Sequence, residues 1–473
     1  MLEKTLRTIE SFIPQTLYRF FQPTYHFLLA LCGAVIYRFP SRELIVILVT
    51  GTKGKTSTAE LLNNILEASG ANTALLGTLR FKVGIESERN LRKITVPGRF
   101  FVQQFLRRAV SARCTHAIIE MTSEGARQFR ERFIDMDALI FTNLAPEHIE
   151  SHGSYENYRD AKLAIALALT RSRKTKRFMI ANADDKEGAK FLKIPGLLPI
   201  PFCLNDGNPV IADEKHVELM FRGTHLHSSL PGLFNAYNIL AAATCATAFG
   251  IPPNIIAAGV KRTGYIPGRM ERIEGGQPFP VIVDYAHTPD SLEAVYKTFP
   301  EHQKICVLGN TGGGRDRWKR PVMGKIADEY CSHIILTNED PYDEDPKKIL
   351  EEMKPGIKKH APEIILDRRL AINRALSIAK EASRLNGQSR DAILGNRKNS
   401  VVLITGKGTD PHIMGPHGTK TPWDDRTVVR EELQKLFCNK KPRSKPARVV
   451  RAGRPKLYYR ASPTQSYRHT QEE

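Results

Sequence analysis

Residues 44–56 (LIVILVTGTKGKT) place an apolar run directly before a turn with two glycines and a Lys-Thr pair. The apolar run predicts a buried strand, and the apolar spacing after the turn predicts a helix. Gly51 and Gly54 allow successive backbone N–H groups to point inward, where phosphate oxygens bind at a helix N-terminus. The segment therefore predicts a nucleoside triphosphate site, with Lys55 at the β- and γ-phosphates and the Thr56 hydroxyl on Mg²⁺.

The rest of the composition is typical of a soluble protein with several domains. The 473 residues are enough for two or three domains, each with its own core. Hydrophobic residues make up 41% and charged residues 25%, which is ordinary for globular proteins. The seven cysteines show neither a CxxC pair nor the spacing of metal ligands. We therefore expect buried or incidental thiols in a reducing, cytoplasmic setting, with neither a disulfide framework nor a zinc site.

The net charge of +20 is concentrated partly at the C-terminus. Residues 438–473 carry ten Lys or Arg against two Glu, are rich in Pro and show no apolar periodicity. This composition predicts a basic disordered tail, either a solvated extension or a contact for anionic lipid or nucleic acid. The surplus of +12 outside the tail suits a protein that handles phosphate- and carboxylate-bearing substrates.

A second apolar stretch, residues 25–39 (YHFLLALCGAVIYRF), lies near the N-terminus. Its length is below the ~20 residues needed to span a bilayer, and no secretory signal precedes it. The flanking aromatic and arginine side chains would suit a helix on a membrane surface. A helix docked on the protein's own core is an equal alternative, so both stay open.

Strand-like and helix-like runs alternate along most of the chain, which is typical of parallel α/β sheets with ligands beyond the carboxyl ends of their strands. A helix of small residues is expected at 232–250 and a polar loop insertion at 386–400. We expect a short apolar or helical N-terminal segment at 1–43, a central domain at 44–266, a C-terminal domain at 267–437 and the basic tail at 438–473. The expected strands lie at 44–50, 116–121, 138–144, 179–183, 281–283, 305–308, 334–336 and 401–404.

Several polar motifs accompany these strands. They are TVP at 95–97, IEMTSE at 119–124, TNLAPEHIESHG at 142–153, YRDAK at 158–162, GLFNAYN at 232–238, GRME at 268–271, DYAHTPD at 284–290 and GGGRDRWKRP at 312–321. A single glutamate, histidine or lysine in such a place is more often structural than functional. Roles for these residues therefore depend on the whole set of motifs and not on any one of them.

The motifs, in this order, resemble those of the Mur ligase family, and the resemblance covers about 390 residues, from 44 to 436. Within the family, the chain is most similar to the MurE-type members, the UDP-N-acetylmuramoyl-tripeptide synthetases. The loop GTKGKT resembles the ATP loop of that family, whereas the general pattern G-x-x-x-x-G-K-[ST] would need glycine at Val49. The resemblance implies an α/β fold with a central P-loop parallel-sheet ATPase domain and a Rossmann-like C-terminal α/β domain. It also implies an ATP- and Mg²⁺-dependent acid–amino-acid ligase that extends a muramoyl-dipeptide precursor of peptidoglycan through an acyl phosphate.

The partners that the resemblance implies are small molecules, UDP-MurNAc-peptide and an amino acid. We expect a cytoplasmic monomer that binds no nucleic acid, with peripheral membrane contact through 25–39 or the basic tail as an alternative.

The resemblance also assigns roles to single residues. Glu120 and His148 would bind Mg²⁺ together with Thr56, and hard oxygen donors suit that ion. Lys162 matches a lysine that relatives carbamylate to support the metal, a reaction that needs a neutral amine. The expected catalytic residues are Lys55, Glu120, His148 and Lys162. The expected nucleotide contacts are Gly51, Thr52, Lys53, Gly54, Lys55, Thr56, Ser57, Asn238, Arg269 and Asp284, and the expected substrate contacts are Thr95, Thr122, Ser123, Arg315, Asp340, Tyr342, Gly406 and Asp410.

Two departures from the family pattern bear on the substrates. Where diaminopimelate-adding relatives carry D-N-P-R, this chain has Asp340 in place of asparagine and Tyr342 in place of arginine, so a distal carboxylate loses its bidentate partner. Asp340 would instead accept the ammonium of lysine or another diamine, and the amino acid stays open. The ~43 residues before the first strand are too few for the usual UDP-binding domain, so a lipid-linked muropeptide is an alternative acceptor.

Three other functions stay open at this point. A folylpolyglutamate-type ligase shares the architecture, although DYAHTPD and EMTS argue against it. An inactive paralogue would be expected to lose residues such as Lys55 and Glu120, which are present. A P-loop protein could instead bind membrane or nucleic acid through its tail, and ligation that survives deletion of 439–473 would argue against this.

Overall fold

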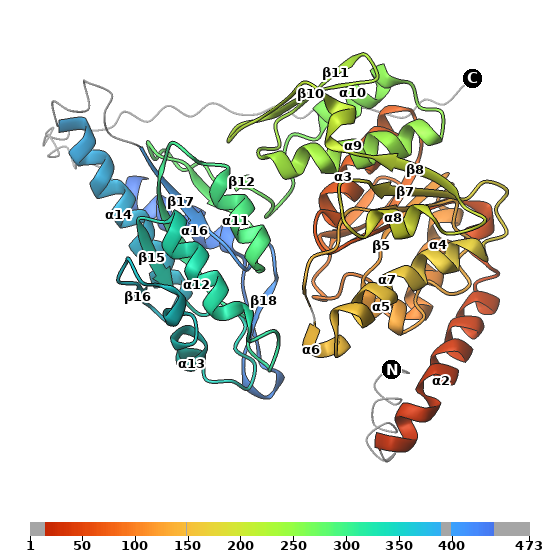
Figure 1. Cartoon of the computed structure of the whole chain (residues 1–473), viewed down its shortest axis with the longest axis horizontal. Coiled ribbons are helices and arrows are strands. Elements are labelled where there is room, and N and C mark those ends of the chain that lie inside the picture. Colours follow the sequence, from red (N-terminus) through yellow and green to blue (C-terminus); the bar gives the residue numbers. More distant parts are fainter. Residues whose placement is uncertain (1–14, 148, 389–398, 439–473) are drawn as a thin grey trace, which may run out of the picture.

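The computed structural model describes residues 15–147, 149–388 and 399–438. The predicted metal ligand His148 and the basic tail at 439–473 lie outside these residues. Two α/β bodies lie side by side, one built on the sheet of β1–β8 and the other on the sheet of β12–β17 (Figure 1). The expected α/β class, with a parallel-sheet central body and a second α/β body, is confirmed.

The central body contains an eight-stranded sheet in the order β4-β3-β2-β5-β1-β6-β7-β8. Strand β1 lies between β5 and β6, with Ile45 opposite His116 and Ile47 opposite Ala138. All other pairs in this sheet are parallel, and β3 at the edge pairs antiparallel with both β2 and β4. Their bounds are β1 Ile45–Thr50, β2 Thr73–Leu76, β3 Arg80–Val83, β4 Glu86–Arg89, β5 His116–Glu120, β6 Ala138–Phe141, β7 Phe178–Asn182 and β8 Leu198–Phe202.

Helices cover both faces of this sheet, which is why β1 is apolar at nearly every position. One core includes α3 (Lys55–Ala68), α9 (Leu233–Ala248) and α10 (Pro253–Arg262), and the other includes α4 (Arg99–Ser111) and α7 (Tyr155–Thr170). Helix α10 packs so closely on α3 that a Cβ on Gly259 would lie 2.4 Å from the Ile65 Cα. This packing fixes α3 at the carboxyl end of β1. The shorter helices are α5 Ser123–Arg127, α6 Ile149–His152 and α8 Gly188–Leu192.

A small antiparallel sheet beside α9 is a feature that the sequence patterns did not predict. It consists of β9 (Val210–Ala212), β10 (Val217–Phe221) and β11 (Thr224–Ser228). Its inward side chains Val217, Leu219 and Phe221 alternate with more exposed neighbours, because only one face of this sheet is covered.

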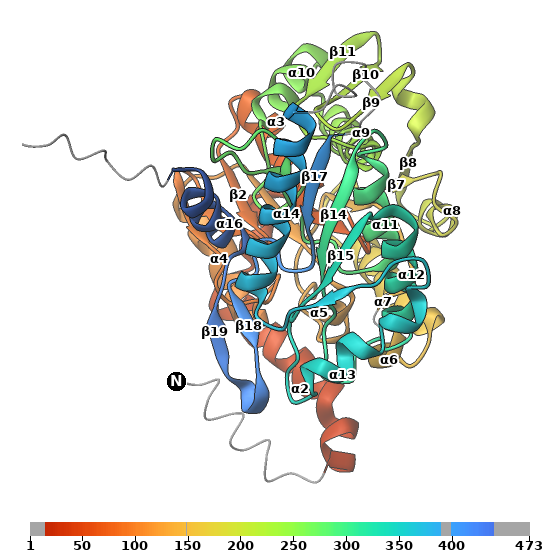
Figure 2. The same ribbon diagram turned by 90° about the vertical axis from the view of Figure 1, so that its left-hand side faces the viewer.

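The second body contains a six-stranded sheet in the order β12-β13-β17-β14-β15-β16, parallel except for β12. Helix α14 lies in front of this sheet in Figure 2 and packs on it with α16, while α11 and α12 cover the other face. The predicted loop at 386–400 is wrong at both ends, since α14 continues to Gln388 and β17 begins at Ser400, while residues 389–398 lie outside the described residues. The bounds are β12 Glu271–Arg272, β13 Val281–Val283, α11 Pro289–Lys297, β14 Gln303–Leu308, α12 Lys319–Tyr330, β15 His333–Leu336, α13 Pro346–Glu351, β16 Glu363–Ile364, α14 Arg368–Gln388, β17 Ser400–Ile404, β18 His412–Met414, β19 Lys420–Pro422 and α16 Asp425–Leu433.

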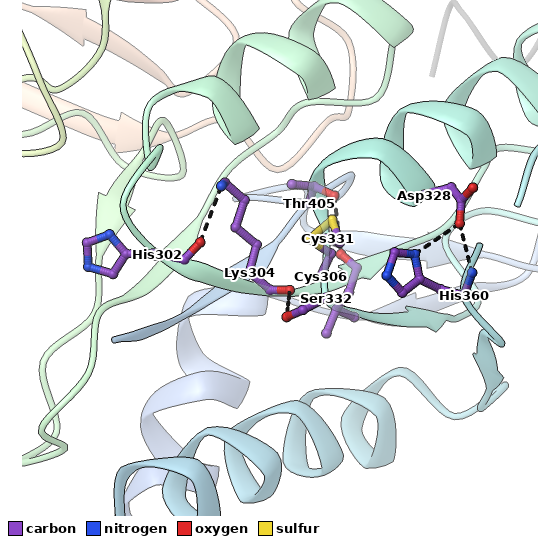
Figure 3. Close-up of a disulfide and its surroundings, with 9 residues drawn as sticks. His302, Lys304, Cys306, Asp328, Cys331, Ser332, His360 and Thr405 are labelled. Carbon is purple, nitrogen blue, oxygen red and sulfur yellow. Dashed lines mark hydrogen bonds and ion pairs between the residues drawn. A yellow bond between two sulfur atoms is a disulfide. The ribbon is translucent and has the colours of Figure 1, made fainter. Parts of the chain in front are cut away.

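Two cysteines of this body form a disulfide, Cys306 of β14 and Cys331 at the end of α12 (Figure 3). Both are buried, and Ser332 beside the bond donates from its backbone and hydroxyl to the Lys304 carbonyl. The expectation of incidental thiols is therefore wrong for this pair. The two cysteines are 25 positions apart in the sequence, and the residues between them contain a loop and a helix that return the chain to the neighbouring strand, which sequence spacing does not reveal.

The apolar N-terminal stretch lies in α2 (Gln15–Ile36), which extends away from the central body (Figure 1). One face packs on α4 and buries Ala30 and Ala34, while Leu28 and Ile36 are more than half exposed. Within 15–147, 149–388 and 399–438, no helix is both long and apolar enough to cross a membrane. Docking on the protein's own core thus accounts for one face of the helix and leaves the other uncovered.

Candidate active site

The nucleotide loop leaves β1 after Thr50 and enters α3 at Lys55. Gly51 has φ +148°, and a Cβ there would lie 2.0 Å from the Thr142 hydroxyl. Gly54 has φ +80°, and a Cβ there would lie 2.3 Å from Asn238 Oδ1. Both positions therefore require glycine, for backbone conformation as well as for space. The close approach brings Asn238 of α9, an expected nucleotide contact, directly against the loop.

Residues that follow β6 hold this loop in place by hydrogen bonds to the backbone of Lys53. The Thr142 hydroxyl donates to the Lys53 carbonyl at 2.6 Å. The Asn143 side chain accepts from the Lys53 backbone N–H at 2.9 Å and donates to its carbonyl at 3.1 Å. The loop shape is thus fixed by neighbouring residues of the protein itself.

Two lysine side chains converge on one loop carbonyl. Nζ of Lys55 and Nζ of Lys162 each donate to the Gly51 carbonyl at 2.8 Å, and Lys55 also donates to the Thr52 carbonyl. Burial lowers the pKa of Lys162 well below its ordinary range, and the charge of Lys55 lowers it further. The arrangement therefore favours a neutral amine at Lys162, the form that reacts with CO₂.

The Glu120 carboxylate lies at the end of β5, beside the start of α3. It accepts from the Thr56 hydroxyl at 2.9 Å, and from the backbone N–H and hydroxyl of Thr78 at 2.8 and 2.9 Å. Burial raises the pKa of Glu120, whereas the Thr78 N–H and the charge of Lys55 oppose this shift. The Thr78 hydroxyl also lies 3.0 Å from the hydroxyl of Thr95, which links an expected substrate contact to the expected metal ligand.

Thr56 and Glu120 together form a donor set suited to Mg²⁺. A hydroxyl and a carboxylate oxygen 2.9 Å apart are hard donors, and Mg²⁺ usually keeps waters and phosphate oxygens as its other ligands. In the part of the chain that the structure describes, no group of three or more His, Cys, Asp or Glu is arranged to hold a metal.

A cavity of about 520 Å³ lies between the two bodies above the loop. Pairs that join the two bodies across it include Lys53 Nζ with Asp290 at 2.9 Å and Glu147 with His287 Nε2 at 3.0 Å. Both bodies thus contribute to one site. The predicted residues that line it are Thr52, Lys53, Gly54, Lys55, Thr56, Ser57, Thr95, Thr122, Asn238, Arg269, Asp284, Arg315, Asp340, Tyr342, Gly406 and Asp410.

Four predicted residues do not line this cavity. Gly51 and Glu120 are hydrogen-bonded to the lining residues Lys55 and Thr56, and Lys162 is hydrogen-bonded to Gly51. Ser123 is buried with its hydroxyl 3.2 Å from His152 Nε2, and its contact with a substrate stays a prediction. His148 lies outside the described residues.

On the second body, Arg269 and Asp284 face the nucleotide loop. The Arg269 guanidinium lies over the Tyr285 ring, 4.5 Å from its centre. The buried Asp284 carboxylate accepts the backbone N–H groups of Met270 and Ala286, each at 2.7 Å, and burial raises its pKa. Asp284 therefore holds the GRME and DYAHTPD segments together, whether or not it also contacts a ribose.

The far end of the cavity holds a cluster of charges, Lys93, Asp340, Lys407 and Asp410. Lys407 Nζ lies 2.9 Å from Asp340 and 2.8 Å from Asp410. Lys93 Nζ, from the loop after β4, lies 2.6 Å from Asp340 and 3.1 Å from Asp410. Asp340 was expected to accept the ammonium of a diamine substrate, and in this structure two lysines of the chain contact it.

Beside this cluster, Arg315 lies over the Tyr342 ring at 5.0 Å, while Lys93 lies 5.9 Å from the centre of the same ring. Glu339 accepts from the Thr311 hydroxyl through Oε1 at 2.9 Å. Its buried Oε2 has no hydrogen-bond partner among the described residues. The pocket thus presents a guanidinium on an aromatic surface and a buried carboxylate oxygen that lacks a donor.

Sequence reasoning missed Thr78, Lys93, Glu147 and Glu339 as site residues. Thr78 and Lys93 belong to no motif, and only the sheet edge formed by β3 and β4 brings them to the cavity. Glu147 lies inside the 142–153 motif and Glu339 lies next to the predicted substrate contact Asp340, so the sequence could have indicated both as site residues. The contact of Glu147 with His287 depends on how the two bodies pack together.

Comparison with known proteins gives consistent matches over most of the chain. Residues 49–246 match the Mur ligase middle domain, and residues 268–408 match the Mur ligase glutamate ligase domain. The chain is 34% identical over 421 residues to UDP-N-acetylmuramoyl-L-alanyl-D-glutamate–2,6-diaminopimelate ligase of Syntrophomonas wolfei, covering 86% of this chain and 81% of the relative. It is 35% identical over 437 residues to UDP-N-acetylmuramyl-tripeptide synthetase of a Roseiflexus species, covering 86% and 82%.

Solved structures agree with this result. A structure of UDP-N-acetylmuramoyl-L-alanyl-D-glutamate–2,6-diaminopimelate ligase superposes with a TM-score of 0.54 at 27% identity, covering 83% of this chain and 79% of that one. MurF from Acinetobacter baumannii superposes with a TM-score of 0.64 at 17% identity, covering 86% and 80%, which supports the fold alone.

Proposed function

The chain belongs to the Mur ligase family of ATP-dependent amide ligases, and we propose that it joins an amino acid, as the third peptide residue, to a UDP-N-acetylmuramoyl dipeptide. The observation that carries this proposal is the shared cavity. The triphosphate loop of one body and Arg315 with its charged neighbours on the other body line the same cavity, so the nucleotide and the amino acid can bind next to each other. The acceptor is taken from the names of the relatives.

In the proposed reaction, a carboxylate oxygen of the acceptor attacks the γ-phosphorus of ATP, ADP leaves and an acyl phosphate forms. The amine of the amino acid then attacks the acyl carbon, loses a proton, and phosphate leaves. Lys55 and the loop N–H groups stabilise the charge on the phosphate oxygens, and Arg315 holds the α-carboxylate of the amino acid. Catalysis then consists mainly of positioning and electrostatic stabilisation.

The metal and carbamate assignments are parts of the same proposal. Thr56 and Glu120 would hold Mg²⁺, with His148 as a further ligand expected from its motif, and the ion would neutralise phosphate charge. Thr78 orients Glu120 through two hydrogen bonds. Lys162, whose pKa burial lowers well below its ordinary range, would carry the carbamate.

We propose that the enzyme works as a cytoplasmic monomer. The uncovered apolar side chains of α2 support peripheral contact with a membrane as a further part of this proposal. Flotation with anionic vesicles tests this part, since Leu28→Asp should lower the bound fraction and leave ligation unchanged.

The direct test is phosphate release from ATP with UDP-MurNAc-dipeptide and a panel of amino acids. We expect release only when nucleotide, dipeptide and amino acid are all present, and a new amide product by mass spectrometry. Lys55→Ala should abolish release, whereas Lys186→Ala, outside the cavity, should not. Release that does not require the dipeptide would contradict the proposed acceptor.

A further inference from the structure

The disulfide of the second body joins the middle of its sheet to the end of a covering helix (Figure 3). Cys306 lies on β14, which is paired on both sides, with β15 and with β17. Cys331 directly follows α12. The bond therefore closes a ring of the chain that contains the whole of α12 and the loop from Gly309 to Trp318.

This ring carries part of the cavity wall. At the start of α12, Lys319 Nζ donates to the His287 carbonyl at 3.2 Å, and Arg320 donates to the Thr311 carbonyl at 3.3 Å. The residues of the ring that line the cavity are Thr311, Arg315, Asp316 and Lys319. The position of α12 thus affects the loop that presents Arg315 to the cavity.

The other end of α12 is joined to β14 at the disulfide. Beside the bond, the exposed Ser332 donates to the Lys304 carbonyl from its backbone N–H at 2.9 Å and from its hydroxyl at 3.0 Å. The remaining attachment is apolar packing, which includes Met323 and Ala327 of α12. Because a disulfide restricts the opened chain, its loss makes opening of the ring more favourable.

Two features indicate that this bond can open and close in the folded enzyme. Disulfides in a reducing compartment, where we place the enzyme, are usually transient and redox-sensing. The Cys331 side of the bond lies next to exposed chain, since Ser332 and His333 are both exposed, whereas Cys306 is fully buried. Local opening at the end of α12 would therefore bring the Cys331 sulfur within reach of a thiolate.

We propose that the Cys306–Cys331 disulfide is a reversible redox clamp on the second body, closed by disulfide oxidants and opened by dithiols. In opening, a thiolate of the dithiol attacks the Cys331 sulfur, the S–S bond breaks and Cys306 leaves as a thiolate. The second thiolate of the dithiol then attacks the mixed disulfide and releases Cys331. Two electrons and two protons pass to the cysteine pair, and the dithiol becomes a disulfide.

The open clamp loosens α12 and the loop that carries Arg315, and it leaves the nucleotide loop of the first body unchanged. Amino-acid binding is then weaker in the reduced enzyme than in the oxidised enzyme. This control goes beyond the proposed function, and only its effect on ligation rests on that function.

The first test follows the bond itself in the full-length enzyme. The folded protein is treated with oxidised glutathione or with dithiothreitol, quenched with acid, and then unfolded in the presence of iodoacetamide. Peptide mass spectrometry should find both cysteines unlabelled after oxidation and both labelled after reduction. A pair that remains labelled after oxidation, or a bond that dithiothreitol does not open in the folded protein, would overturn the proposal.

The second test measures unfolding of the second body by the fluorescence of Trp318 and Trp423. Reduction should raise the unfolding constant by about 10²-fold, because the bond joins residues separated by 25 positions, and reoxidation should restore it. The double variant Cys306→Ala/Cys331→Ala should behave like the reduced enzyme and ignore dithiothreitol. Cys245→Ala is the matched control, since Cys245 is a buried free thiol of the first body, and it should keep the full redox response.

Equal unfolding constants in the two redox states would overturn the clamp. If the double variant does not fold, the oxidised and reduced forms of the wild-type enzyme decide the question alone.

The third test compares ligation by the oxidised and reduced enzymes. Reduction should raise the KM of the amino acid by about tenfold, because a slight misplacement of a binding group has effects of this size or larger, and leave the KM of ATP unchanged. Equal KM values for the amino acid would overturn the effect on the loop. If no ligation is found, the proposed acceptor is wrong, and the labelling and unfolding measurements still decide whether the bond is a reversible clamp.

Discussion

A buried ion pair beneath the amino-acid pocket allows a quantitative test of the structure. Arg368 of α14 and Asp425 of α16 have fully buried side chains and form two parallel hydrogen bonds of 2.8 and 2.7 Å. Arg368 also donates to the Thr405 carbonyl at 2.8 Å, and Trp423 donates to Asp425 at 2.8 Å. The pair therefore ties two helices to the segment that leads into Gly406.

Asp425→Asn keeps the shape of this side chain and removes its charge. The guanidinium of Arg368 then stays buried without a counter-charge, which we expect to lower the free energy of unfolding of the second body by about 3–5 kcal/mol. Glu363→Gln is the matched control. Arg374 and Glu363 have the same two-bond geometry, but their side chains are 48% and 40% exposed, so the loss should stay below about 1 kcal/mol.

Urea unfolding followed by tryptophan fluorescence measures this difference. The chain has two tryptophans, Trp318 and Trp423, and both belong to the second body, so the signal reports its unfolding. At equal slope, the midpoint of Asp425→Asn should fall much further than that of Glu363→Gln. Equal losses in the two variants, or a loss below about 1 kcal/mol for Asp425→Asn, would refute the burial argument.

Three further predictions concern the site and the N-terminal helix. Glu120→Gln removes one hard anionic donor, so it should lower phosphate release by at least about 10²-fold and raise the Mg²⁺ concentration needed for half-maximal rate. An unchanged Mg²⁺ dependence would argue against Glu120 as a ligand. The Lys162→Arg variant cannot form a carbamate and should be inactive. The wild-type enzyme should lose activity in CO₂-depleted buffer and recover it with bicarbonate. Wild-type activity that does not depend on CO₂ would contradict the carbamate. Burial and the charges of Arg99 and Arg130 lower the pKa of His26 in the folded protein to about 4. The unfolded chain therefore binds a proton at His26 at higher pH than the folded protein does. The contribution of neutral His26 to the free energy of unfolding is then lost as pH falls from 6.5 to 4. Thermal unfolding of His26→Gln should depend less on pH over that range than the wild type, and equal slopes would contradict this assignment.

The sequence predicted the parts of the fold that local patterns encode. The strand before the nucleotide loop and the helix after it follow from apolar spacing and two glycines, and the structure begins the strand at Ile45, one residue after the expected start, and has the helix at Lys55–Ala68. The strands around 281–283, 305–308, 334–336 and 401–404 were predicted for the same reason. The antiparallel sheet at 210–228 was missed because its strands are short and only half covered.

Long-range contacts account for what the sequence could not predict. Asp340 was singled out correctly as a pocket residue, but its two lysine partners come from positions 93 and 407, which only the packing of the two bodies brings together. Likewise, the disulfide joins residues on opposite ends of a loop and helix. Thr78 orients Glu120 from a neighbouring strand connection without belonging to any motif.

Transfer of oxygen isotope is the most direct measurement of the central claim, that ATP activates a carboxyl group between the two bodies. The acceptor is prepared with ¹⁸O in both oxygens of the reacting carboxylate, and the products are analysed by mass spectrometry after ligation. We predict one ¹⁸O in the released inorganic phosphate and one in the new amide. Inorganic phosphate free of ¹⁸O, or label in AMP, would contradict the proposed mechanism.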